Sequence, residues 1–242
     1  MRTDYTTERR VACYDCLGNH LISPVRMLDY FQQSSHEQSE ALGVGQRFLT
    51  TSGLSWVLIK YHVDFLSYPA CDDLVTVLTE AKSVKGFFSQ RRFALFNAGG
   101  ELLADAKTQW AMLDRKTGEM VRLEQIPEND KYGVSGNAFP YRFKKIRKIG
   151  DVTFTDSVKV MIGDIDFNGH VNHVNYFNWA LAPVASRLTK GEQVKSVDIY
   201  FKQQAFLGDV LTIRGAMIDD STLRADIVRD DEIICENLIV LA

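Results

Sequence analysis

Apolar residues recur along the chain with two spacings, one typical of helices and one typical of strands. A striped stretch from Val25 to Leu42, stopped by Gly43, predicts a helix. A similar stretch from Val171 to Leu188 predicts a second helix. Runs with the composition of strands lie at 55–61, 73–77, 87–96, 101–113, 196–201, 208–213, 223–229 and 232–241.

The two halves of the chain repeat each other weakly. In each half the helical stretch is followed by a strand, a turn and another strand. Val25 aligns with Val171, and residues 73–77 (DLVTV) match 209–213 (DVLTI) most clearly. Chance similarity is the alternative, but the shared order of elements favours a true repeat.

Consecutive strands joined by turn residues predict antiparallel hairpins, as at 97–100 (NAGG) and 230–231 (DD). One helix per sheet then gives an α+β unit, an antiparallel sheet wrapped around one long helix. We expect two tandem units, at 1–115 and 149–242. The linker expected between them, at 116–148, contains two segments of loop composition.

Composition excludes several classes of protein. The chain has 242 residues, 45% of them hydrophobic and 24% charged, which is close to a globular average. Its net charge of -3 provides no basic field for nucleic acid. We find no apolar run long enough for a membrane span and no secretory signal, so we expect a cytoplasmic protein. Cys13 and Cys16 look like free thiols on a strand, because no second cysteine pair accompanies them.

The stretch 166–173 (DFNGHVNH) places an acid, two amides and two imidazoles in front of the second helix. In an extended segment Asp166, Asn168 and His170 would point to the same side. An acid, an amide and an imidazole on one side can orient and deprotonate a water. Ordinary helix capping is the alternative for any one of these residues, but it does not explain the whole set.

The stretch resembles the signature of the acyl-acyl carrier protein (acyl-ACP) thioesterases, D-x-N-x-H-V-N-N, followed by Tyr and Trp on the next helix. Here the latter are Tyr176 and Trp179, and His173 stands at the second Asn of the family's pair. The resemblance implies two hotdog units in one chain and release of a fatty acid from acyl-phosphopantetheine on ACP. It also implies that Asp166, Asn168 and His170 match the family's catalytic residues.

The sequence departs from the family pattern at Gln204. The family usually has a Glu there, about 34 residues past the His, and Gln cannot accept a proton as a base. If the Glu is the base, its loss costs roughly 100- to 10,000-fold in rate. If it only orients water, Gln204 can replace it. A catalytically silent acyl-binding relative therefore stays open as an alternative. An acyl-CoA thioesterase also stays open, because hotdog proteins include such enzymes and one would share this site.

We expect one active site, in the second unit, because residues 18–24 of the first unit keep an Asn and a His but no acid. The first unit would then shape the acyl pocket. Candidate substrate-binding residues are Val25, Leu28, Trp56 and Tyr176, with plain core packing as the alternative.

The sequence contains no metal or cofactor motif. A basic cluster at 144–148 is either a solvated linker end or a docking point for an acidic carrier protein. Because one chain already supplies two units, we expect a monomer or a homodimer.

Overall fold

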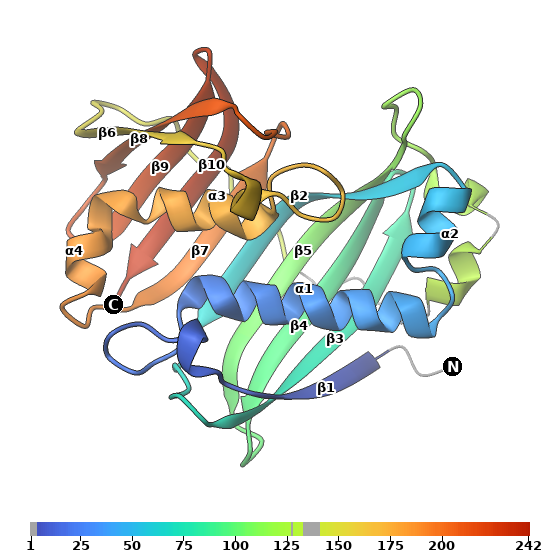
Figure 1. Cartoon of the computed structure of the whole chain (residues 1–242), viewed down its shortest axis with the longest axis horizontal. Helices are drawn as coiled ribbons and strands as arrows, with labels where there is room; N and C mark the ends of the chain where they lie inside the picture. The colour runs from blue at the N-terminus through green and yellow to red at the C-terminus, as the bar shows by residue number, and fades with distance from the viewer. Residues whose placement is uncertain (1–3, 127, 133–140) are drawn as a thin grey trace.

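A computed structural model describes residues 4–126, 128–132 and 141–242. Ten strands form one antiparallel sheet in the order β1-β3-β4-β5-β2-β7-β10-β9-β8-β6. The first five strands build one half of the sheet and the last five the other, and the halves meet where β2 pairs with β7 (Figure 1). The strands are β1 (Asp4–Arg10), β2 (Leu54–Phe65), β3 (Leu74–Lys85), β4 (Phe88–Asn97), β5 (Leu102–Asp114), β6 (Phe154–Lys159), β7 (Val194–Phe201), β8 (Val210–Met217), β9 (Thr222–Arg229) and β10 (Glu232–Leu241).

The long helix α1 (Pro24–Ala41) lies across the first half of the sheet, and the short helix α3 (His173–Ala180) lies on the same face of the second half (Figure 1). Helix α1 begins where the Ser23 hydroxyl accepts a hydrogen bond from the Val25 backbone N–H, at 3.3 Å. Phe31 on its buried side stacks on Phe93 of β4, with ring centroids 5.4 Å apart. The predicted α+β class, two tandem hotdog units, is confirmed.

The second predicted helix is wrong in length. It was expected to run to Leu188, but α3 ends at Ala180, and the chain continues as η5 (Ala182–Val184) and α4 (Ala185–Leu188). Pro183 accounts for the interruption, because its ring nitrogen has no hydrogen to donate to the preceding turn.

The internal repeat is visible in backbone hydrogen bonds. The isolated bridge between Cys16 and Ile22 has a counterpart between Ile165 and Val171. The Ile22 N–H donates to Pro69, and the Val171 N–H likewise donates to Ala205. Val171 therefore matches Ile22 and not Val25, so the helix alignment made from the sequence was three residues out of register.

Several smaller elements were not predicted from the sequence. They are β1, β6, α2 (Gln46–Thr51), η2 (Leu123–Gln125), η3 (Asn129–Tyr132) and η4 (Ile162–Asp164). Cys13 and Cys16 lie on and beside the 3-10 turn η1 (Cys13–Asp15), so the strand expected there is wrong. Both are free thiols, Cys13 exposed and Cys16 partly buried. Among the described residues, none of the helices combines the length and apolar character that a membrane span requires.

Part of the predicted linker crosses the outer face of the sheet, opposite the helices. Tyr61 of β2 faces the helix side, where it stacks on His173, so its neighbour His62 faces outward. Tyr141 stacks on His62 at 4.6 Å, and the Arg224 Nε donates to the Arg147 carbonyl at 3.0 Å. Of the segments with loop composition, residue 127 and residues 133–140 lie outside the described residues.

Candidate active site

The polar stretch forms a tight loop in front of α3, which we call the polar loop (residues 165–172). The bridge between Ile165 and Val171 closes it, and the Asp166 N–H donates to the His170 carbonyl at 3.0 Å. The Gly169 N–H donates back to the Asp166 carbonyl at 3.0 Å. Gly169 has φ +84°, a left-handed conformation that costs glycine little and other residues more.

The side chains of the polar loop are brought together by this turn. One Asp166 carboxylate oxygen accepts from the Asn168 backbone N–H at 2.8 Å, and the other accepts from the Asn168 side-chain amide at 3.3 Å. The His170 Nδ1 lies 3.9 Å from the Asp166 Oδ1. Both of these side chains are about four-fifths buried, whereas Asn168 is exposed.

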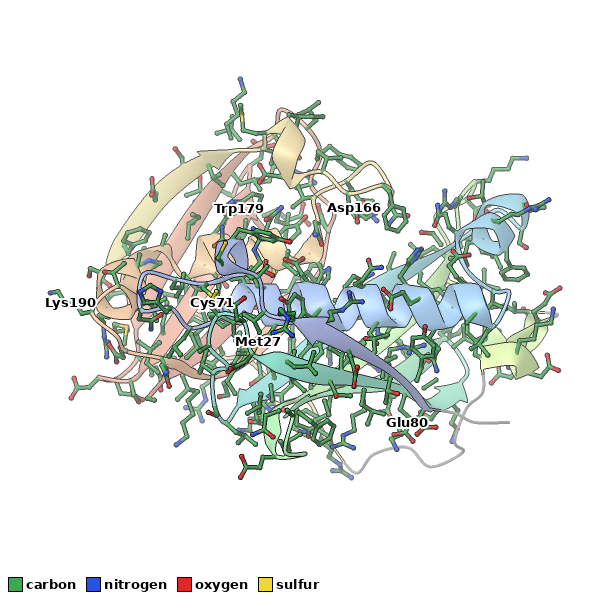
Figure 2. All side chains as sticks on the ribbon, turned by 60° about the horizontal axis from the view of Figure 1, so that its bottom comes forward. Met27, Cys71, Glu80, Asp166, Trp179 and Lys190 are labelled. Carbon is green, nitrogen blue, oxygen red and sulfur yellow. The ribbon has the colours of Figure 1, made fainter. Side chains whose placement is uncertain are left out.

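The expected extended conformation of this stretch is wrong, because Phe167 and Asn168 occupy a turn. The three predicted side chains nevertheless share one small region, since the Asp166 carboxylate folds back over the turn. The labelled Asp166 lies on the loop that leaves the second unit toward the first (Figure 2). Phe167 reaches the first unit, where its ring lies 5.9 Å from that of His36 on α1.

His173 differs chemically from the Asn that the family has at its position. Burial lowers the pKa of His173 to about 4, so the ring stays neutral near pH 7. It stacks on Tyr61, with centroids 6.0 Å apart, and its Nε2 has no hydrogen-bond partner among the described residues. The ring therefore packs between the two units.

Gln204 lies beside the polar loop. Its neighbour Ala205 accepts from the Val171 N–H at 2.9 Å, which places 204–205 alongside 170–171. The Ala205 N–H in turn donates to the Tyr176 hydroxyl at 2.9 Å. The Gln204 side chain is exposed and makes no hydrogen bond within the described residues, while its carbonyl accepts from Arg229.

A pocket of about 800 Å³, including its part open to solvent, reaches from the polar loop into the first unit. Phe167 and Asn168 form part of its edge. The other lining residues come from α1, from α2 and the glycine before it, from strands β2 to β5, and from η3, which supplies Tyr132. Of the predicted substrate-binding residues, Trp56 lines this pocket. Val25 and Leu28 are in the core, and Tyr176 is buried behind the polar loop.

Sequence reasoning missed other residues that line the pocket. His36 and Arg91 are the polar side chains that stand out, from α1 and β4. Arg91 had a detectable signal, because it shares a strand face with the buried Phe93 and Leu95. Within the described ranges, no three His, Cys, Asp or Glu side chains gather as a metal site would require.

The first unit holds a second copy of the loop without its chemistry. The Leu17 N–H donates to the Leu21 carbonyl, as the Asp166 N–H does to His170 in the second unit. The His20 N–H donates to the Leu17 carbonyl, as the Gly169 N–H does to Asp166. Leucines thus stand at the positions of the acid and the imidazole, and only Asn19 is kept at the position of Asn168.

The fold and the loop define a double-hotdog protein with a polar turn at the edge of a pocket. Residues 2–128 match the acyl-ACP thioesterase N-terminal domain, and residues 148–238 match the acyl-ACP thioesterase C-terminal domain. The chain belongs to the acyl-ACP thioesterase family.

Plant enzymes are among its relatives. An oleoyl-ACP thioesterase of Arabidopsis thaliana is 24% identical in an alignment of 221 positions that covers 83% of this chain and 60% of that protein. A dodecanoyl-ACP hydrolase of Cinnamomum camphora is 24% identical in an alignment of 248 positions, gaps included, that covers 96% of this chain and 62% of that protein. The chain thus spans less than two thirds of the length of these curated relatives.

Solved structures share the whole architecture. An oleoyl thioesterase described from Lactobacillus plantarum superposes with a TM-score of 0.91 at 25% identity, covering 98% of this chain and 95% of that one. A 12:0-ACP thioesterase from Umbellularia californica has a TM-score of 0.89 at 16% identity, covering 100% and 98%. The latter likeness supports the fold alone.

Proposed function

We propose that the protein hydrolyses the thioester of an acyl group carried on ACP and releases the free fatty acid. The proposal is carried by the polar loop, on which the side chains of Asp166 and His170 lie close to Asn168, and Asn168 lines the edge of the pocket. The oleoyl-ACP and dodecanoyl-ACP named for the relatives support this class of substrate.

In the mechanism we infer, a water beside His170 attacks the thioester carbonyl. The imidazole takes the proton of the water, while Asp166 orients the ring and balances its charge. Asn168 carries both a donor and an acceptor and aligns the water or the carbonyl. The first turn of α3 has N–H groups without helical partners, which suit the developing oxyanion. The C–S bond then breaks and the departing thiolate takes the proton.

Gln204 supports the second candidate, an acyl-binding relative without turnover. It lies where the family has a Glu, next to the polar loop, and its amide cannot take a proton. In the hydrolase it would orient the water through hydrogen bonds. An acyl-CoA thioesterase would use the same residues.

Two further expectations stay predictions. They are the cytoplasmic location of the protein and its occurrence as a monomer or a homodimer.

The test is thiol release from matched panels of acyl-ACP and acyl-CoA. Asn168→Ala and Asp166→Ala should each lower kcat by roughly 100-fold or more while the protein stays folded. Asn19→Ala is the matched control, because Asn19 occupies the equivalent place in the first unit's loop.

The outcomes separate the candidates. The thioesterase is supported if the wild type and Asn19→Ala release thiol from acyl-ACP while Asp166→Ala and Asn168→Ala do not. Faster release from CoA moves the substrate to acyl-CoA. Acyl binding without any release establishes the binding relative.

A further inference from the structure

Three side chains that line the pocket away from the polar loop have a chemistry that its proposed use leaves unexplained. They are Trp56 of β2, Tyr132 of η3 and Arg91 of β4, which we call the end wall. Tyr61 packs on His173, three residues beyond His170, and Trp56 lies five residues away from Tyr61 along β2. β2 has a bulge between Leu58 and Lys60, and the partners of Tyr61 and Trp56 on β5 are only four residues apart, which at the usual rise of a strand is about 13 Å.

The aromatic part of the end wall is held in place from two sides. The Trp56 indole N–H donates to the Tyr132 hydroxyl at 3.2 Å, and the two rings meet edge to face with centroids 5.5 Å apart. Behind them lies a separate hydrophobic cluster that contains Val44, Met112 and Leu123, all fully buried. Rings packed against a dense cluster cannot give way to a longer chain without strain.

Arg91 adds a charge to the end wall. The side chain is only 8% exposed, and its Nη1 donates to the neutral side chains of Gln38 and Thr79. No carboxylate forms an ion pair with it in the described part of the chain, whereas its neighbour Arg92 pairs with Asp105 at 2.7 Å. The Arg91 Nε and Nη2 also have no hydrogen-bond partner in the described part of the chain. These two nitrogens are not fully buried, so water can reach them.

The open guanidinium nitrogens therefore face the pocket and depend on its water. Burial lowers the pKa of Arg91 to about 10, which still leaves the group charged near pH 7. The methyl end of an acyl chain pressed against these N–H groups would displace that water and offer no acceptor in return. Buried donors left unpaired in this way carry a substantial free-energy cost.

We propose that the end wall sets the maximum length of the acyl chain that the pocket accepts. Trp56 and Tyr132 block a longer chain by their volume, and Arg91 opposes it because an apolar chain end would strip water from the guanidinium. The inference rests on the proposed function, since it takes the pocket to hold the acyl group.

The experiment measures binding of acyl-pantetheine amides of increasing chain length, in which nitrogen replaces the thioester sulfur so that no turnover is required. Trp56→Leu and Arg91→Leu should move the preferred length upward. Ala81→Leu, which adds volume at another lining position, should move it downward. In Trp56→Leu and Arg91→Leu, which open the pocket, the affinity relative to wild type should rise about 10-fold or more for each methylene beyond the wild-type optimum.

Arg92→Leu is the matched control, because Arg92 does not line the pocket and is paired with Asp105. It should leave the preferred length unchanged. The inference is overturned if Trp56→Leu, Arg91→Leu and Ala81→Leu all keep the wild-type preference for chain length. It is also overturned if Arg91→Leu lowers the affinity for all chain lengths equally, as the loss of a purely structural residue would. A second series with a hydroxyl at the chain end tests Arg91 directly. The hydroxyl offers the guanidinium an acceptor, so the wild type should bind long hydroxyl-ended chains better than methyl-ended chains of the same length, and Arg91→Leu should lose this advantage. Equal discrimination against both chain ends in the wild type would overturn the barrier role.

The same amides keep the two proposals apart. Thioesters of the same lengths are assayed in parallel for thiol release. If the variants change the preferred chain length in binding but no thioester is cleaved, the hydrolase proposal fails and the proposal for the end wall is supported. If thioesters are cleaved but no variant shifts the preference, only the end wall fails.

Discussion

At the scale of single residues, the two copies of the loop show how little sequence separates a site from its scaffold. Leu17 and Asp166 occupy equivalent positions, as do Leu21 and His170, and both loops keep the same backbone hydrogen bonds. The backbone of the turn therefore does not depend on the polar side chains. The acid and the imidazole are more readily explained by chemistry than by the needs of folding.

Gln204 gives the first prediction at this scale. Gln204→Glu should raise kcat by roughly 100-fold near neutral pH if the side chain touches the attacking water, because a carboxylate there can accept the proton. Steady-state hydrolysis of one acyl-ACP measures the effect. The control is Gln203→Glu, which places the same charge one residue away, where the side chain instead accepts from Arg229. An unchanged kcat in Gln204→Glu would show that residue 204 does not contact the water.

At the scale of elements, most of the sheet was predictable. The hairpins β4–β5 and β9–β10 follow from long runs of strand-forming residues with turn residues between them. Strand β6 (FTDSVK) was not predicted because four of its six residues are exposed polar side chains at the edge of the sheet. The end of α3 was not predicted because the apolar pattern continues through Pro183.

The site was predictable only in part, for a related reason. The spacing of Asp166, Asn168 and His170 identified the chemistry, but a period-two pattern does not distinguish a strand from a turn that a left-handed glycine permits. The pocket combines α1 with four strands and a loop of the other unit. Such a meeting of distant segments depends on the tertiary fold and has no local pattern.

Tyr176 provides a prediction about how elements position the site. Its hydroxyl accepts from the buried Ala205 N–H, and Ala205 accepts from Val171 at the edge of the polar loop. Tyr176→Phe should lower the free energy of unfolding by about 1 to 3 kcal/mol, because the N–H is left unpaired. It should also reduce kcat more than it raises KM, because the segment that carries Gln204 loses its anchor.

Urea unfolding and steady-state kinetics measure the two effects of this change. Tyr30→Phe is the control, since it removes a hydroxyl that donates to Asp15 in the first unit. It should cost stability without a matching loss of kcat. Equal loss of kcat in both variants would contradict a positioning role for Tyr176.

At the scale of the whole molecule, the two units are joined by a polar seam on the outer face of the sheet. His62 of β2 lies opposite Asp198 of β7, with its Nδ1 2.9 Å from the carboxylate, and its Nε2 is 3.1 Å from Asp64. Tyr141 stacks on the ring and its hydroxyl donates to Asp198 at 3.4 Å. Lys107 completes the group by pairing with Asp64 at 3.3 Å.

The charges of the seam have a defined dependence on pH. Burial opposes a charge on His62, but hydrogen bonds to Asp198 and Asp64 outweigh it and raise the pKa of the imidazole above 6.5. Its contribution to stability is therefore complete below pH 6.5 and is lost as pH rises through the raised pKa. The hydrogen bond to His62 lowers the pKa of Asp64 to about 2, so that contribution is lost only as pH falls below 3.8 toward 2.

Replacing His62 by Gln removes the charge but keeps hydrogen-bonding atoms, so it tests this joint between the units. At about pH 5.5 the variant should lose about 1.5 to 3 kcal/mol of unfolding free energy, the usual worth of hydrogen bonds between charged groups. The loss should shrink as pH rises and the wild-type ring, with its raised pKa, gives up its proton, so urea unfolding at about pH 5.5 and about pH 8.5 measures the difference. His20→Asn is the control, because His20 is exposed and Asn tolerates its left-handed backbone. A loss that is equal at both pH values would mean that His62 joins the units by shape and not by charge.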